Sequence, residues 1–163
     1  MIESDLPITH GDVPAPKPTC SAIYLLDQKQ VEHYWPRIEA ELLAEPELWS
    51  NWWTLEALFA GMLNDTIQVW VISNTDEKLT AIFMTQILTA PAGRVLQVFW
   101  MRGKIPDGAI NRISLTLDHF GKHHNCFRLC VAGRKGWERL LRPIGAQLDT
   151  IILTRPITDM RRH

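Results

Sequence analysis

Histidines and cysteines near residue 120 are the side chains of this sequence whose chemistry suits a metal ion. His119 and His123 lie four residues apart, so a helix would place both imidazoles on one face. A structural zinc ion takes four ligands, however, and neither a third ligand nor a His-Glu-x-x-His motif is evident. We therefore expect surface histidines near a helix end and no metal site.

Cys126 and Cys130 form a second pair four residues apart. We expect both to face the same side of a β-strand as buried thiols, because side chains an even number of residues apart share a strand face. Three cysteines without a paired spacing favour a reducing compartment and a cytoplasmic location. Neither a Gly-x-Ser-x-Gly elbow nor a Gly-x4-Gly-Lys-Ser/Thr loop occurs, so the sequence carries neither of these signatures of covalent catalysis or nucleotide binding.

A basic face is predicted on a helix near the C-terminus. Glu138 offsets part of its charge, and a solvated helix face is the default interpretation. Contact with an acidic partner surface is the alternative. The basic side chains are Arg134, Lys135, Arg139 and Arg142.

The composition is that of a soluble globular domain. Of the 163 residues, 46% are hydrophobic and 21% are charged, and the net charge of −1 gives no reason to expect a nucleic-acid partner. We expect no membrane contact, because no apolar run approaches the roughly 20 residues of a membrane span. The acidic, proline-rich N-terminus does not resemble a signal peptide. A chain of this length is most simply one domain.

A strand-helix-strand unit between Cys126 and Leu153 organises the predicted fold. Trp137, Leu140, Leu141 and Ile144 recur at helical spacing, so a helix of about three turns is expected with Trp137 in the core. Gly145 follows where a helix C-cap favours glycine, and Leu148 to Leu153 is predicted as a strand.

The preceding elements are predicted from periodicity and capping residues. A strand at 21–26 leads to a helix capped by Asp27 and interrupted by Pro36, and Thr54 caps a second helix. Three strands at 67–73, 79–88 and 95–101 form an antiparallel meander, and Asp107 is expected to cap the next helix. The tryptophans, of which there are seven, are expected to fill or border the core, with an exposed aromatic docking patch as the alternative.

The resulting fold class is α/β (α+β), a mixed sheet flanked by helices in the order β-α-α-β-β-β-α-β-α-β. Residues 1–20 carry four prolines and are expected to be a flexible arm. Residues 21–157 form the domain, and residues 158–163 form a C-terminal tail.

This order, from residue 21 onward, resembles the GNAT acyltransferase superfamily. The family carries an Asn, an Ala, a Tyr general acid and a Gly-Phe pair across its last long helix. Aligning the Gly with Gly145 places Arg134 at the Asn, Trp137 at the Ala, Leu141 at the Tyr and Ala146 at the Phe. The apolar frame is similar, but the polar functional positions differ.

The resemblance also implies a pyrophosphate loop between the third meander strand and the next helix, written Gln/Arg-x-x-Gly-x-Gly/Ala in the family. Such a loop binds coenzyme A through backbone N–H groups at a helix N-terminus. Neither of the two possible registers over residues 102–109 puts glycine at the required positions, and Pro106 and Asp107 oppose phosphate binding. If coenzyme A binds, the candidate contacts are Arg102, Gly103, Lys104 and Gly108.

The sequence Gly-Arg-x-Gly-Trp-Glu-Arg-Leu-Leu, with Ile-Gly-Ala after it, is also similar to GNAT-like proteins encoded by bacteriophages, some of which are carried in virions. We therefore expect a GNAT-fold protein without a cofactor that acts by binding, as a virion structural or accessory component. Its expected partners are proteins, with virion proteins reached through the N-terminal arm, and its location would be the host cytoplasm or the virion.

The alternative function is an acetyl-CoA-dependent N-acyltransferase. Because Leu141 stands at the position of the family's general acid, the catalytic residues are unknown. Glu77, His10 and Tyr24 are the side chains that could supply the acid or base. The acyl acceptor, the oligomeric state and the partner do not follow from the sequence.

Overall fold

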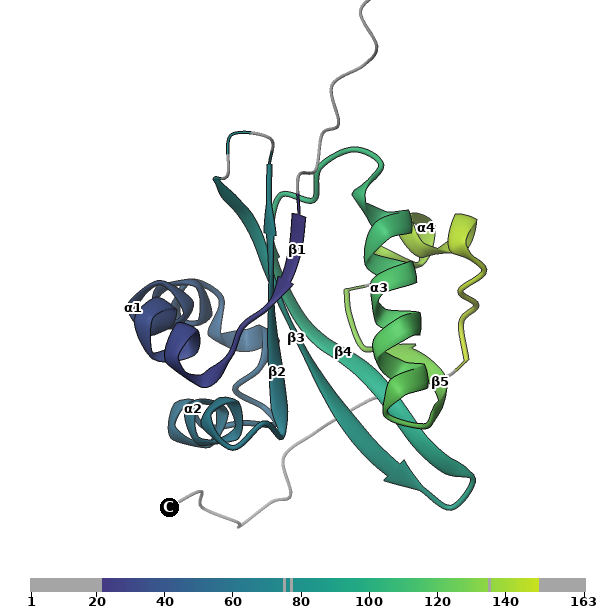
Figure 1. The fold of residues 1–163 in the computed structure, drawn as a ribbon, viewed down its shortest axis with the longest axis horizontal. Helices are drawn as coiled ribbons and strands as arrows, with labels where there is room; N and C mark the ends of the chain where they lie inside the picture. The colour runs from purple at the N-terminus through teal and green to yellow at the C-terminus, as the bar shows by residue number, and fades with distance from the viewer. Residues whose placement is uncertain (1–21, 75, 77, 135, 150–163) are drawn as a thin grey trace, which may run out of the picture.

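The computed structural model describes residues 22–74, 76, 78–134 and 136–149, which form a five-stranded sheet with helices on both faces (Figure 1). The observed order confirms the predicted one as far as the last helix. The predicted arm (1–20) and tail (158–163) lie outside the described residues, as does the predicted last strand beyond Asp149. The elements are β1 (Ala22–Leu25), α1 (Gln28–Ala44), the 3₁₀ helix η1 (Pro46–Leu48), α2 (Leu55–Leu63), β2 (Ile67–Ser73), β3 (Leu79–Ala90), β4 (Gly93–Gly103), α3 (Ala109–His123), β5 (Cys126–Val131), α4 (Trp137–Leu141) and the 3₁₀ helix η2 (Arg142–Ile144).

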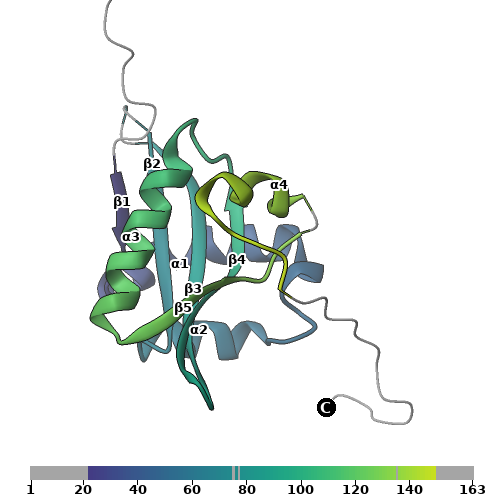
Figure 2. The same ribbon diagram turned by 90° about the vertical axis from the view of Figure 1, so that its right-hand side faces the viewer.

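The strands lie in the sheet in chain order, from β1 at one edge to β5 at the other. Neighbours are antiparallel, as the meander predicted, except that β5 runs parallel to β4. A parallel pair needs a crossover connection, and α3 supplies it. Figures 1 and 2 show α1 and α2 on one face of the curved sheet and α3 and α4 on the other.

Two β-bulges change which way the side chains of β4 and β5 point. Phe99 is an extra residue of β4 opposite the step from Met84 to Thr85, and Phe127 is an extra residue of β5 opposite the step from Arg94 to Val95. A bulge reverses the alternation of side chains for the rest of its strand. The pairing of β4 with β5 ends at Val98 and Val131, immediately before the first of these bulges.

The bulge at Phe127 corrects the prediction that Cys126 and Cys130 share a face. Cys126 packs against the core on the α3 side of the sheet, as do Leu129 and Val131. Alternation then turns Cys130 to the opposite face. Both are half-buried free cysteines.

Capping explains where α1 and α2 begin. The Asp27 carboxylate accepts a hydrogen bond from the Gln30 amide at 2.8 Å, and the Gln30 side chain accepts one in return from the Asp27 amide. Thr54 caps α2 through the Ala57 amide at 3.1 Å. Pro36, which was predicted to interrupt this helix, lies within α1 without dividing it into two helices.

The two later helices differ more from prediction. The cap of α3 is Gly108, with a φ of +75° and no side-chain cap, so the prediction that Asp107 is the cap is wrong. The chain enters α3 through a left-handed residue, a conformation that glycine adopts readily. Helix α4 has only five residues because Pro143 lacks an N–H donor and ends the α-helical pattern, after which η2 continues to the predicted cap Gly145.

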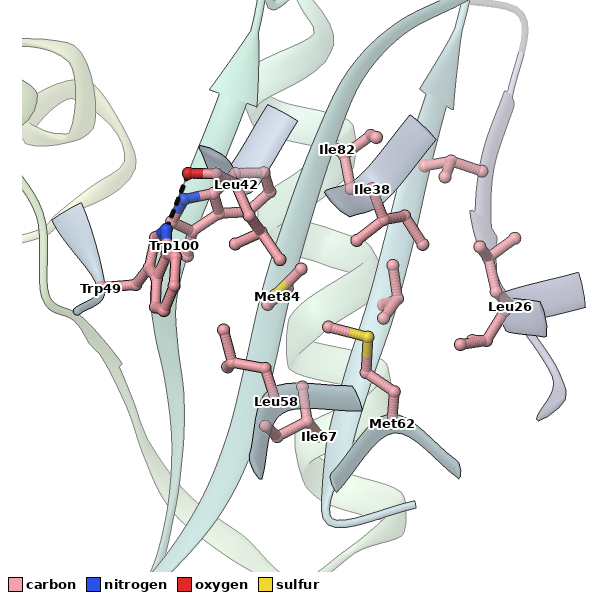
Figure 3. Close-up of a cluster of buried hydrophobic side chains, with 13 residues drawn as sticks. Leu26, Ile38, Leu42, Trp49, Leu58, Met62, Ile67, Ile82, Met84 and Trp100 are labelled. Carbon is pink, nitrogen blue, oxygen red and sulfur yellow. Dashed lines mark hydrogen bonds between the residues drawn. The ribbon is translucent and has the colours of Figure 1, made fainter. Parts of the chain in front are cut away.

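A hydrophobic core lies on each face of the sheet. The core on the α1 side, shown in Figure 3, includes Ile38, Leu42, Trp49 and Trp100. The core on the α3 side includes Trp70, Phe83, Ile113 and Leu117. Three tryptophans are thus core residues as predicted, whereas Trp52 is 67% exposed.

Candidate functional site

The loop between β4 and α3 is the position at which the sequence predicted coenzyme A contacts. Its first residues pack against β3: the Lys104 amide donates a hydrogen bond to the Thr80 carbonyl at 2.9 Å. Gly103 has a φ of +104°, and a Cβ there would lie 2.3 Å from the same carbonyl oxygen. The backbone of these two residues therefore contacts the neighbouring strand.

Arg102 forms the centre of an ion-pair network on the α1 face. Its Nε lies 2.9 Å from Glu41 Oε2 and its Nη1 lies 2.5 Å from Glu45 Oε1, both near the C-terminal end of α1. Arg134, just after β5, forms an ion pair with Glu45 as well. The network joins α1 to the diverging ends of β4 and β5. Glu41 and Glu45 escaped the sequence analysis, although two glutamates four residues apart on a predicted helix could have suggested a basic partner. Arg134 was predicted on a basic helix face and not as a partner of α1.

Lys104 and Gly108 lie further along the loop and are solvent-exposed. The amide of Ala109 donates to the Pro106 carbonyl at 3.0 Å in the turn before α3. No atom lies within 4 Å of a Cβ placed on Gly108, so this residue is needed for its backbone conformation and not for close packing. The loop thus turns Arg102 towards α1 and leaves Lys104 and Gly108 exposed to solvent.

Leu141, at the position of the family's general acid, borders an apolar cavity of about 30 Å³ between α3, α4 and the sheet. Such a volume holds about one water molecule. Ser114 is the single polar residue of its lining, and no ionisable side chain takes part. The structure therefore provides no proton donor at this position of the described chain.

The connection from α1 to α2 contributes tryptophan side chains to the core on the α1 side of the sheet, on the opposite face from the cavity. Trp49 is buried and donates from Nε1 to the Leu42 carbonyl at 2.8 Å (Figure 3). Trp53 stacks on Phe99 with ring centroids 5.5 Å apart. Trp100 is buried, and its Nε1 has no hydrogen-bond partner among the described residues.

Of the three candidate acids or bases, His10 and Glu77 lie outside the described residues. Tyr24 lies on the edge strand β1 and is 56% exposed. The register Tyr24–Val71, Val71–Ile82, Ile82–Arg102 places it three strands away from the loop, about 14 Å at the usual strand spacing. Tyr24 is not brought to the predicted coenzyme A contacts.

The histidines near the end of α3 lie close to one another without forming a ligand set. In the described part of the chain, no three His, Cys, Asp or Glu side chains could hold one metal ion. Burial lowers the pKa of His124 below its ordinary value of 6.5, and the neighbouring charges of His123 and Arg94 lower it further. No described helix has the length and apolar character needed to span a membrane.

Several solved structures with a similar fold are described as acetyltransferases, whereas no protein-family model and no curated protein matches the sequence. A ribosomal-protein-alanine N-acetyltransferase from Brucella melitensis biovar Abortus 2308 matches with a TM-score of 0.60 and 14% identity, over 84% of this chain and 100% of that one. A predicted acetyltransferase with acetyl-CoA from Clostridium acetobutylicum matches at 0.59 and 13%, over 86% and 99%. An aminoglycoside acetyltransferase, HMB0005, from an uncultured soil metagenomic sample matches at 0.63 and 9%, over 84% and 98%. At these identities the likeness shows the fold alone, and it confirms the predicted GNAT-like architecture.

Proposed function

We propose that this GNAT-fold chain acts by binding another protein and not by acyl transfer. The observation that carries the proposal is the ion-pair network of Arg102. Its guanidinium, the first cation of the loop region, contacts Glu41 and Glu45 and is directed towards α1. A pyrophosphate would have to compete with two carboxylates for it.

The other groups of the loop fit a pyrophosphate equally poorly. The Lys104 amide is bonded to Thr80, Pro106 has no N–H, and Asp107 adds a negative charge. Leu141 cannot protonate a leaving thiolate. Because these residues do not fit coenzyme A, no catalytic step is assigned to them.

The role in a bacteriophage virion stays a prediction. It is supported by the amino-acid sequence of residues 133–146, which resembles that of phage-encoded GNAT-like proteins. The N-terminal arm through which virion proteins would be reached lies outside the described residues. The structural features above support the non-catalytic part of the proposal and do not bear on the virion.

An acetyl-CoA-dependent N-acyltransferase is the second candidate function. Similar solved structures favour it, since several of them are described as acetyltransferases and one of them is described with acetyl-CoA. In that case Lys104 and the first-turn amides of α3 would be the remaining contacts for the pyrophosphate.

Calorimetric titration with acetyl-CoA tests the choice between the two functions. Each hydrogen bond lost to a charged group costs about 1.5–3 kcal/mol. Two such losses weaken affinity by a factor of hundreds or more, at about 1.4 kcal/mol per tenfold. We expect binding no tighter than the millimolar range and no acetyl transfer. Micromolar binding that Lys104→Ala weakens would establish the acyltransferase instead, provided that the matched variant Lys29→Ala, on the first turn of α1, binds like the wild type.

A further inference from the structure

The near-neutral net charge conceals a separation of charge between the two faces of the sheet. Residues 27–65, which contain α1, η1 and α2, hold eight Asp or Glu and two Lys or Arg. Residues 109–144, which contain α3, β5, α4 and η2, hold seven Lys or Arg and two Asp or Glu, and of the seven Arg134 reaches Glu45 on the α1 side. These two groups of elements lie on opposite faces of the sheet, apart from β5 at its edge (Figure 1).

Large exposed apolar side chains accompany each charge. On the acidic side, Leu43 of α1 is 57% exposed and Trp52, between η1 and α2, is 67% exposed. On the basic side, Leu115 of α3 is 70% exposed and Leu140 of α4 is 42% exposed. Tryptophan is one of the residue types enriched among the energetic anchors of protein interfaces.

Two surfaces follow from these observations. The acidic surface consists of Glu32, Leu43, Glu47, Trp52 and Glu56, all exposed on the α1–α2 layer. The basic surface consists of Arg112, Leu115, Lys122, Arg139, Leu140 and Arg142, all exposed on α3, α4 and η2. Helices α3 and α4 flank one cavity, so they present the basic surface side by side.

We propose that the acidic surface of one copy of this chain binds the basic surface of a second copy. The charge complementarity of the two surfaces selects this occupant, because each finds its opposite on the same polypeptide. The contact is heterologous, because it joins two different surfaces that lie on opposite faces of the chain. After each copy is added, one acidic surface and one basic surface of the assembly remain unpaired. Such contacts build rings or open filaments and not a closed two-fold dimer. The inference goes beyond the proposed function and does not depend on coenzyme A.

Sedimentation velocity of the full chain at increasing concentration tests this inference. In about 50 mM salt we expect the mass to rise with concentration past that of two 18.7 kDa copies. In about 500 mM salt we expect it to fall towards the monomer, because the Debye length becomes shorter than the separation of surface charges. A monomer at all concentrations in low salt would overturn the proposal.

Complementary variants separate a heterologous contact from other kinds of association. Trp52→Ala with Glu56→Lys alters the acidic surface, and Leu115→Ala with Arg139→Glu alters the basic one; each should weaken self-association by about tenfold or more. Because each double variant keeps one intact surface, an equimolar mixture of the two should form a one-to-one pair and nothing larger. The matched control, Tyr24→Ala with Asp76→Lys, lies on β1 and in the β2–β3 turn and should associate like the wild type. Circular dichroism checks that all variants are folded.

A mass that levels off at two copies, or an Arg139→Glu variant that assembles like the wild type, would show that the basic surface has another occupant and would overturn the proposal. Neither result depends on the titration with acetyl-CoA. The self-association and the non-catalytic function can therefore fail independently.

Discussion

At the scale of single residues, Arg102 shows how the position of a side chain decides between two roles. Its place in the sequence, at the start of the loop before α3, suggested an anion contact. The bulge at Phe99 determines which face of the sheet each later side chain of β4 points to. Met101 therefore packs on the α3 side, and Arg102 reaches Glu41 and Glu45 on the α1 side. The same guanidinium thus contributes to stability by holding a helix to the end of β4.

This role predicts the effect of removing the side chain. Arg102→Ala should lower the free energy of unfolding by about 1–3 kcal/mol, because Glu41 and Glu45 lose the cation that lies between them and only Glu45 keeps another, Arg134. Arg142→Ala is the matched control, since its ion pair with Glu138 is an exposed i, i+4 pair worth about 0.5 kcal/mol or less. Urea unfolding measures both. Equal effects of the two substitutions would contradict the structural role.

Gly103 makes a second prediction at this scale. Its φ of +104° disfavours any other residue, and a Cβ would lie within 2.3 Å of the Thr80 carbonyl oxygen. Gly103→Ala should therefore destabilise the protein by more than about 2 kcal/mol. Gly136→Ala, with a φ of −70° and open space around the Cβ position, should be neutral or stabilise by about 0.4–1 kcal/mol. Thermal unfolding compares the two, and a stable Gly103→Ala variant would show that the loop is not held against β3.

At the scale of elements, helix α4 is attached mainly through Trp137. The ring packs against the core on the α3 side and lies so close to Gly133 that a Cβ there would be 2.4 Å from it. Sequence periodicity predicted a core tryptophan in a three-turn helix. The structure shows a half-buried one in a five-residue helix, because Pro143 ends the α-helix early.

Partial burial reduces the expected cost of removing this ring. Trp137→Ala should destabilise the protein by about 1–3 kcal/mol, below the roughly 3–5 kcal/mol of a fully buried aromatic residue. Leu148→Ala, at a residue that is 64% exposed, should change stability by less than about 0.5 kcal/mol and is the control. Chemical denaturation gives both values. A negligible effect of Trp137→Ala would mean that α4 is not anchored by this residue.

Local signals predicted most of the elements, although the local cap Asp107 was wrong and Pro143 ended α4 early, and two differences came from non-local contacts. Asp27, Thr54 and Gly145 mark helix ends through contacts within a few residues, so the sequence alone identified them. The bulge that turns Cys130 away from Cys126 depends on the register between β4 and β5, which no local pattern records. The ion pairs of Arg102 likewise join residues about 60 positions apart. The sequence could therefore locate the loop, but it could not predict the contacts that Arg102 makes.

At the scale of the whole molecule, one sheet separates two cores and also connects them. Successive residues of the central strands face opposite sides: Val71 and Ile72 of β2 belong to different cores, as do Ile82 and Phe83 of β3. Neither core can lose its packing without disturbing strands that the other one needs. The acidic and basic layers are therefore parts of one cooperative unit and not two subdomains.

This connection predicts a single unfolding transition whichever core is weakened. Leu42→Ala, on the α1 side, and Leu117→Ala, on the α3 side, should each cost about 2–5 kcal/mol, because both side chains are almost completely buried. In each variant, tryptophan fluorescence and far-ultraviolet circular dichroism should give the same midpoint in urea. If Leu117→Ala instead produced an early transition in circular dichroism while the environment of Trp49 and Trp100 persisted, the α3 layer would unfold on its own. Coincident curves in both variants would mean that the sheet transmits the loss of one core to the other.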